Sequence, residues 1–176
     1  GWVWKAGGAL VTNNAGSIQS QVSANVEAGF SIVTYTGTGA NATVGHGLGK
    51  APGLVITKGK NYSGANSNWV VNDASAPWTK ALTLNTTNAT RADSSAYNNT
   101  APTSSVFTLG SNANHNANTY QYVAYCFAEI PGYSKIGSYT GNGSTDGPYV
   151  ECGFKPKFVM IKSTAAGDWK IYDAAR

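Results

Sequence analysis

The sequence predicts an all-β protein: an antiparallel β-sandwich, jelly-roll-like, built on an internally duplicated unit. Three observations support this prediction. Charged residues make up only 11% of the chain, against roughly 25% in ordinary soluble domains, so Asn, Ser, Thr and Gly must supply the polar surface. Short β-branched and aromatic runs alternate with Gly- and Asn-rich turns, which is typical of strands and tight hairpins. Strings of residues also return about 104 positions later along the chain.

The duplication is the strongest signal, because a repeat of this length changes the interpretation of every element. The spacing is 103 residues for the first matching pair and 104 for the next two. Trp2–Ala6 also resembles Tyr125–Glu129, the expected closing strand of a unit. The matching pairs are Gly29–Ile32 with Gly132–Lys135, Tyr35–Gly39 with Tyr139–Gly143, Pro52–Lys58 with Pro156–Lys162, and Asn68–Asp73 with Asp168–Asp173.

The repeat divides the chain into three parts. Residues 1–28 are predicted to hold the closing strand of a preceding unit and a linker, residues 29–129 a complete β-sandwich unit, and residues 130–176 the first part of a second, incomplete unit. Strand patterns run close to both ends, so both are expected to be cut from something longer. An unfinished unit can be completed by a neighbouring copy that donates a strand.

The elements follow from local patterns, taken in chain order. Residues 7–28 admit two interpretations: Ile18, Val22 and Val26 have the spacing of one helix face, but the Gly, Ser and β-branched content fits an extended linker equally well. Residues 75–101 are predicted to be loops around one short strand at Leu82–Leu84. The other strands, each a β-branched or aromatic run bounded by turn residues, are Phe30–Tyr35, Leu54–Ile56, Val106–Leu109 and Tyr120–Phe127.

The charge pattern argues against nucleic acid and membranes as partners. The net charge is +4 and the pI is near 9.0. However, Lys and Arg are scattered and absent between Ala92 and Ser134, so they cannot follow a phosphate backbone. No stretch reaches the roughly 18 apolar residues that span a bilayer.

The residues form no pattern typical of an enzyme, a cofactor site or a metal site. His46 lies in a glycine-rich run without the Lys and Ser or Thr of a phosphate loop, and a tight turn is predicted there. His115 is predicted at a loop tip. Asp73 and Asp173 are repeat equivalents, which favours a structural role such as capping a turn. No catalysis is therefore expected.

The two cysteines leave two possibilities open. Cys126 and Cys152 each lie in an apolar or aromatic strand context, where a buried free thiol is as natural as a disulfide. Neither has a His partner within reach in the sequence, which leaves a metal site or a thiol nucleophile with little support.

The aromatic residues separate core positions from candidate ligand positions. Trp69 and Trp169 occupy equivalent repeat positions, which favours core packing. Tyr62, Trp78 and Tyr97 lie in predicted loops among Asn and Thr residues. Such rings can stack on sugar faces while amides bond the hydroxyls, so these three residues are the predicted glycan-binding positions.

Five strings of the chain form a specific combination: Trp2–Gly8, Gly29–Gly37, Gly45–Gly49, Tyr122–Glu129 and Gly132–Lys135. Together they resemble uncharacterised repeat modules in structural proteins of marine bacteriophages, and the resemblance covers nearly the whole chain. It implies a tail-fibre or other virion-surface component, often found beside lectin-like modules. The resemblance implies no catalytic residues for this chain.

Composition and resemblance together predict a non-catalytic structural or adhesive module of a phage virion, located on the virion surface or outside the cell. The expected partners are its own copies, other virion proteins and host-surface polysaccharide. Two alternatives remain open. One is an accessory domain of a secreted polysaccharide-acting enzyme whose catalytic part lies outside this chain. The other is an architectural protein that binds only its own copies.

Overall fold

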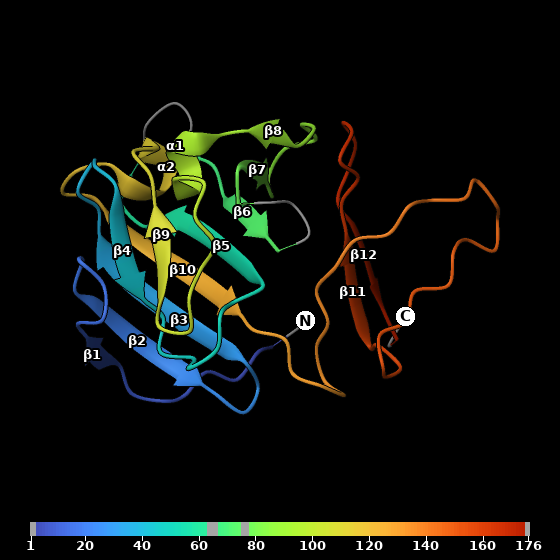
Figure 1. The fold of residues 1–176 in the computed structure, drawn as a ribbon, viewed down its shortest axis with the longest axis horizontal. Coiled ribbons are helices and arrows are strands. Elements are labelled where there is room, and N and C mark those ends of the chain that lie inside the picture. The colour runs from blue at the N-terminus through green and yellow to red at the C-terminus, as the bar shows by residue number, and fades with distance from the viewer. Residues whose placement is uncertain (1–2, 63–66, 75–77, 175–176) are drawn as a thin grey trace.

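The computed structural model describes residues 3–62, 67–74 and 78–174, and it confirms the predicted all-β antiparallel sandwich (Figure 1). The main layer is an eight-stranded sheet with the strand order β1-β2-β3-β10-β5-β6-β7-β8. Its strands span Val11–Asn13 (β1), Ser20–Asn25 (β2), Phe30–Thr36 (β3), Gln121–Phe127 (β10), Leu54–Gly59 (β5), Val70–Asp73 (β6), Lys80–Thr83 (β7) and Arg91–Ala92 (β8).

A smaller layer covers one face of this sheet (Figure 1). It contains one antiparallel strand pair and two single-turn helices, and a second strand pair lies near the C-terminus. These elements span Ala42–Gly45 (β4), Val106–Leu109 (β9), Ser94–Tyr97 (α1), Ala113–Asn116 (α2), Phe158–Ile161 (β11) and Lys170–Asp173 (β12).

The main core lies between the two layers and follows from the alternation of the central strands. β10 lies between β3 and β5, and Tyr122 of β10 is opposite Tyr35 of β3. Successive side chains of a strand point to opposite faces, so Tyr122, Ala124 and Cys126 all point inward and are fully buried. Phe107 of β9 closes the core from the other layer and is also fully buried.

The outer face of the large sheet is apolar over part of its area. Ile56, Val71 and Leu82 form a second buried cluster there, and Trp69 packs against it. Trp169, which immediately precedes β12, also packs on this cluster. The C-terminal segment therefore contacts the apolar part of this outer face through the Trp169 ring, which contributes a large apolar surface there.

The β11–β12 hairpin has the same geometry as the β5–β6 hairpin. Phe158 lies opposite Asp173, as Leu54 lies opposite Asp73. The two hairpins keep this register although the second is shorter by four residues between these positions. A backbone hydrogen bond closes each of them at equivalent positions, from Ala74 N to Gly53 O at 2.7 Å and from Ala174 N to Lys157 O at 2.9 Å.

Residues 7–28 form neither the helix nor the linker that the sequence suggested. β1 and β2 lie in this range, and β2 pairs along its whole length with β3. Ser20 and Val22 are buried because the side-chain period here is two, which places both on the inner face. The division of the chain at Gly29 is therefore not a structural boundary, since β2 and β3 belong to one sheet.

Residues 78–101 hold more regular structure than the one short strand predicted. The strand expected at Leu82–Leu84 is β7, which begins two residues earlier, and β8 and α1 follow it. β8 pairs with β7 through only two positions, Lys80 with Ala92 and Ala81 with Arg91. Such a short pairing leaves no alternating pattern in the sequence, which is why it was not predicted.

Candidate functional site

Two of the three predicted glycan-binding aromatics are core residues, so the prediction is wrong for them. Tyr97, at the end of α1, is fully buried, and its ring meets Trp78 edge to face at 5.4 Å. Trp78 is only 8% exposed. A ring must present an open face to stack on a sugar, whereas these two rings fill the space between the helices and the large sheet.

Tyr62 has a different position. It is half-buried and packs against the main core, and its ring meets that of Tyr120 edge to face at 5.1 Å. Tyr120 is 40% exposed. The pair lies at the start of β10, next to Lys60 and Gln121, which line a groove on the outer face. Tyr62 is therefore the one predicted glycan residue that the structure places beside a surface depression.

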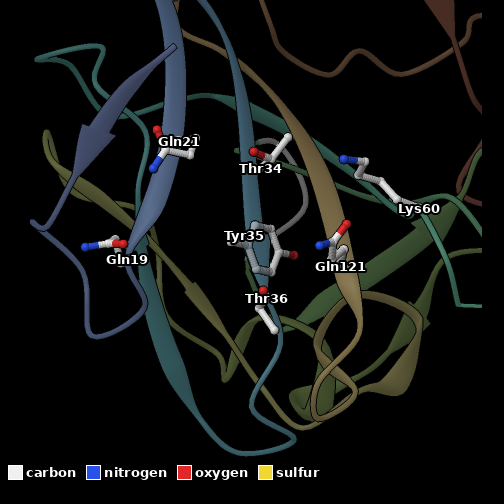
Figure 2. Close-up of a pocket in the computed structure, with 7 residues that line it drawn as sticks. All are labelled: Gln19, Gln21, Thr34, Tyr35, Thr36, Lys60 and Gln121. Carbon is white, nitrogen blue, oxygen red and sulfur yellow. The ribbon is translucent and has the colours of Figure 1, made fainter.

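This depression, which we call the amide groove, is a shallow concavity of about 250 Å³ over β2, β3 and β10 (Figure 2). It occupies the polar part of the same outer face whose apolar part is covered by Trp169. The lining residues are Gln19, Gln21, Thr34, Tyr35, Thr36, Lys60 and Gln121.

The strand registers bring the polar side chains of the groove together. Gln21 of β2 is opposite Thr34 of β3, and Thr36 of β3 is opposite Gln121 of β10. Side chains opposite each other on one face lie roughly 5 Å apart, so the four form a continuous polar surface. Lys60 joins them because its backbone N–H donates to the Gln121 carbonyl at 2.8 Å.

The amides on the β2 side are held in place by neighbours. The Gln19 side-chain amide donates to Asn14 Oδ1 at 2.9 Å, and that of Gln21 donates to Thr12 Oγ1 at 3.0 Å. On the β10 side, the side-chain amide of Gln121 makes no hydrogen bond to any residue that the structure describes, and it is exposed. The groove thus offers oriented amides, free donors and acceptors and one positive charge, which suits a hydroxyl-rich ligand.

Sequence reasoning missed these groove residues. The available signal was the alternation within strands: Thr34 stands between Val33 and Tyr35, and Gln121 stands between Tyr120 and Tyr122. A polar residue between large apolar ones in a strand marks the solvent-facing side of the sheet. The registers that align these positions across three strands come only from the structure.

The histidines serve packing. His46 is fully buried; its Nε2 lies 3.1 Å from the Thr103 carbonyl, and its Nδ1 accepts from Leu48 N–H at 3.2 Å. Burial lowers the pKa of His46, and the hydrogen bond to Thr103 partly offsets this. The ring is therefore a neutral brace of the turn after β4.

His115 is also buried, which corrects the prediction of a loop tip. It lies in α2, whose first turn is capped by Asn112, and its Nδ1 is 3.2 Å from Thr57 Oγ1 of β5. The Tyr97 ring meets it edge to face at 5.1 Å. Burial lowers the pKa of His115 to about 4. The helical turn packs the ring against β5, a central strand of the large sheet. A four-residue polar helix gives no sequence pattern that would predict this burial.

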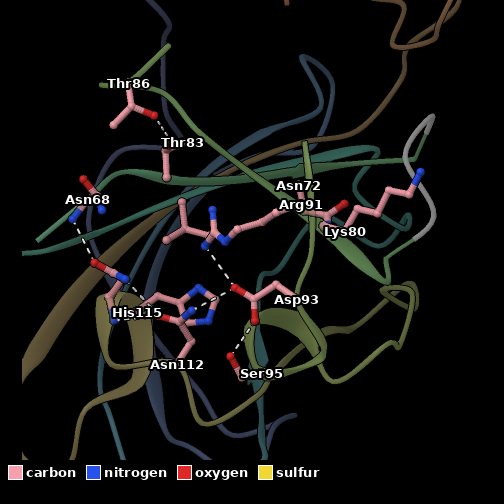
Figure 3. Close-up of polar contacts among 12 residues, drawn as sticks. Asn68, Asn72, Lys80, Thr83, Thr86, Arg91, Asp93, Ser95, Asn112 and His115 are labelled. Carbon is pink, nitrogen blue, oxygen red and sulfur yellow. Dashed lines mark hydrogen bonds and ion pairs between the residues drawn. The ribbon is translucent and has the colours of Figure 1, made fainter. Parts of the chain in front are cut away.

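Asp93 ties the loops of this end together (Figure 3). It pairs with Arg91 at 2.9 Å and accepts hydrogen bonds from Ser95 Oγ and, at 3.1 Å, from Asn112 Nδ2. Burial alone would raise the pKa of Asp93, but the hydrogen bond from Ser95 and the charge of Arg91 outweigh it and lower the pKa. With three hydrogen bonds from the protein to its two oxygens, this carboxylate serves to fix α1 and α2.

The remaining reactive groups lie apart from each other. Both cysteines are free thiols, and burial raises the pKa of Cys126 to about 12, which makes it unreactive. Across residues 3–62, 67–74 and 78–174, no group of three His, Cys, Asp or Glu side chains is placed to hold a metal ion. Within the same part of the chain, no helix is long and apolar enough to span a membrane.

Comparison with known proteins identifies a family for the entire chain. The model of the family described as "Domain of unknown function (DUF7483)" matches residues 1–176, so the chain belongs to that family. No curated protein and no solved structure matches the chain.

Proposed function

We propose that this member of the DUF7483 family is a non-catalytic structural and adhesive module of a bacteriophage virion surface, of the tail-fibre or appendage type. The assignment to a virion is based on the five stretches of sequence that resemble structural proteins of marine phages. The observation that supports the structural role best is the C-terminal hairpin, which repeats β5–β6 in register and packs Trp169 on the first unit. Stacking of equivalent pieces is how repeat proteins build extended bodies.

The absence of catalysis is part of the proposal, and the placement of the polar groups supports it. A general base must reach a substrate proton at hydrogen-bond distance, whereas His46 and His115 are fully enclosed and contact only the protein. Asp93 is committed to Arg91 and its helix neighbours. His46 thus braces the turn after β4, and His115 and Asp93 hold the segments around α1 and α2.

The adhesive role is assigned to the amide groove. Polysaccharides are recognised by amide and hydroxyl hydrogen bonds with an aromatic ring beside them, and the groove places Gln121 and Lys60 next to the Tyr62–Tyr120 pair. Lys60 favours a polysaccharide that carries acidic groups. We therefore assign host-surface polysaccharide as the ligand class.

The virion location is tested by immunogold electron microscopy of purified phage particles, with antibodies raised against the chain. Labelling of a fibre or of the particle surface is the expected result. Antibodies adsorbed beforehand with the purified chain serve as the control. Particles that stay unlabelled, in a lysate that contains the chain, would refute a virion role.

The groove is tested by binding of the purified chain to a panel of acidic and neutral polysaccharides. Gln121→Ala and Lys60→Ala are each expected to weaken binding about tenfold. A tenfold change equals about 1.4 kcal/mol, which is the contribution of one hydrogen bond to the ligand. Lys50→Ala is the matched control, because Lys50 is exposed but does not line the groove. Equal losses in all three variants would place the ligand elsewhere.

A further inference from the structure

The sheet face that carries the amide groove continues to a second lysine, Lys58. This residue lies in β5 opposite Val123 of β10, and Val123 is in turn opposite the groove residue Thr34. Ile56, two positions before Lys58 on β5, belongs to the outer cluster, so alternation places Lys58 on the outer face as well. Thr34, Val123 and Lys58 thus form one row of side chains across this face.

Lys58 and Lys60 form a pair of cations beside the groove. Lys60 follows β5 directly and lines the groove (Figure 2). The two residues are two positions apart on one side of the chain, so their Cα atoms are separated by roughly 7 Å. Like charges at this separation repel each other. An anion placed between the two ammonium groups is attracted by both and reduces their repulsion.

No acidic residue balances these two cations in the sequence around them. The stretches 28–72 and 94–128 contain neither Asp nor Glu, and β3, β5 and β10 lie entirely within them. Neither lysine forms a salt bridge with any residue that the structure describes. The positive charge at this end of the sheet therefore remains available to an anionic ligand.

The acidic residues that flank these strands lie at the opposite end of the sheet. Glu27 precedes β3, Glu129 follows β10, and Asp73 is opposite Leu54 at the start of β5. The distance along β5 from Leu54 to Lys58 is roughly 13 Å. This distance exceeds the Debye length of about 8 Å at physiological ionic strength. The flanking carboxylates are therefore largely screened from the two lysines.

Ser67 fixes the ammonium group of Lys58 before any ligand binds. Nζ of Lys58 donates to the Ser67 carbonyl at 2.6 Å and to Ser67 Oγ at 2.8 Å. Ser67 Oγ donates in turn to the Tyr62 carbonyl at 2.9 Å. An ammonium group has three donors, so one N–H group of Lys58 remains for a ligand. Because Lys58 is already oriented, it loses less side-chain entropy on binding.

The surface next to Lys58 is aromatic. Trp69 and Tyr125 stack with ring centroids 6.1 Å apart and ring planes at 20°. Tyr125 lies two positions from Val123 on β10 and therefore on the same face. Both rings are half-buried and pack against the outer cluster. Apolar surface beside cations suits an acidic sugar, which has both a ring and a charged group, better than a bare inorganic anion.

We propose that Lys58 and Lys60 together bind the anionic group of an acidic sugar, while the amides and hydroxyls of the groove bind the adjoining neutral sugars of the same polysaccharide. This inference rests on the adhesive role proposed for the groove and names the chemical group that the groove selects. Ser67 is a positioning residue, because it acts through Lys58.

The arrangement of the strands gives the direction of the bound polysaccharide. From β5 through β10 and β3 to β2 the site crosses three strand spacings, which is roughly 14 Å. The polysaccharide therefore lies across the strands, with its acidic sugar over β5. The neutral sugars lie at the β2 end, because the side chains of Gln19 and Gln21 carry no charge and present acceptor oxygens that would repel a second anionic group.

The test is binding of the purified 176-residue chain to polysaccharides in matched acidic and neutral forms, measured by isothermal titration calorimetry. The carboxylated probes are hyaluronan and alginate, each compared with its carboxyl-reduced form. The sulfated probe is dextran sulfate, compared with dextran. Wild type is expected to bind an acidic form at least tenfold more tightly than its neutral counterpart. Binding of a carboxylated probe identifies a carboxylate, and binding of dextran sulfate alone identifies a sulfate ester.

Variants assign the effect to the lysine pair. Lys58→Met and Lys60→Met each remove one charge and keep the apolar stem, and each is expected to weaken binding of the acidic form about tenfold without changing binding of the neutral form. Ser67→Ala keeps both charges and is expected to weaken binding of the acidic form alone, about threefold, because Lys58 is no longer held. Lys50→Met is the matched control, because Lys50 is exposed and does not line the groove.

The paired probes separate recognition from damage to the fold. A variant that merely disturbs the structure loses both forms alike, and this result for Lys58→Met would overturn the inference. Equal binding of the acidic and neutral forms by wild type would also overturn it. Wild-type affinity in Ser67→Ala would overturn the positioning role of Ser67. If neutral polysaccharides bind and acidic ones bind no better, the adhesive role stands without this inference, whereas both are rejected if no polysaccharide binds.

Discussion

Replacement of Trp169 by Ala is expected to release the β11–β12 hairpin from the outer face of the large sheet. The indole packs on the cluster of Ile56, Val71 and Leu82, and its Nε1 donates to the Thr83 carbonyl at 2.9 Å. If on the order of 150 Å² of the side chain is covered, burial contributes roughly 4 kcal/mol at ~25 cal/mol per Å². The hydrogen bond adds about 1 kcal/mol.

These figures count area against a fully exposed reference, so they are upper bounds. A loss of about 3–5 kcal/mol in the docking free energy of the hairpin is therefore the expectation. An isolated two-stranded hairpin is at best marginally stable in water. β11 and β12 should consequently lose their pairing once they are undocked, whereas β3, β10 and β5 have their own core and should stay folded.

Amide hydrogen exchange read strand by strand measures both effects in one sample. In Trp169→Ala, amides of residues 158–161 and 170–173 are expected to exchange as in an unfolded chain, while those of β10 keep their protection. Tyr172→Ala is the matched control, because Tyr172 lies in the same hairpin but is 60% exposed. If the amides of the hairpin stay protected in Trp169→Ala, Trp169 does not hold the hairpin on the large sheet, and the reasoning is refuted.

Three further predictions concern the first unit. Burial lowers the pKa of His115 to about 4 from 6.5, so protons bind the unfolded state first as the pH falls. The free energy of unfolding should therefore decrease between pH 6.5 and about 4, by up to about 3 kcal/mol. Urea unfolding across this pH range, repeated on His115→Gln, measures the decrease. Gly110→Ala should cost about 1–3 kcal/mol, since a Cβ there would lie 2.1 Å from the Ser95 carbonyl oxygen, whereas Gly141→Ala meets nothing within 4 Å; thermal unfolding compares the two. A thiol reagent at pH 8 should modify one cysteine per folded chain and both after denaturation, because Cys126 is fully buried.

The sequence was sufficient where a hydrophobic period and turn residues agree. Val106–Leu109 was predicted to the residue, and Phe30–Tyr35 to within one residue of β3. Over four residues or more, these strands alternate buried positions with less buried ones, which is the signal that periodicity detects. The repeat matched Pro156–Lys162 with Pro52–Lys58 and Asp168–Asp173 with Asn68–Asp73, and the structure shows that β11 and β12, which lie in the later segments, pair in the same register as β5 and β6.

The sequence was insufficient where long-range contacts decide burial. Tyr97 and His115 stand among Asn, Ser and Thr residues, which predicts exposed loops, yet the single-turn helices α1 and α2 bring both rings into the core. Each helix has only four residues, too few for a helical pattern. Their position depends on Asp93, which joins residues 91, 95 and 112, and such a network has no local signature.

The amide groove was missed for a related reason. Most of its residues come from β2, β3 and β10, Gln19 precedes β2 and Lys60 follows β5. β10 begins 85 residues after β3 ends. Thr36 and Gln121 become neighbours only because β10 inserts between β3 and β5. A binding surface assembled across such a distance follows from topology, and no window of sequence contains it.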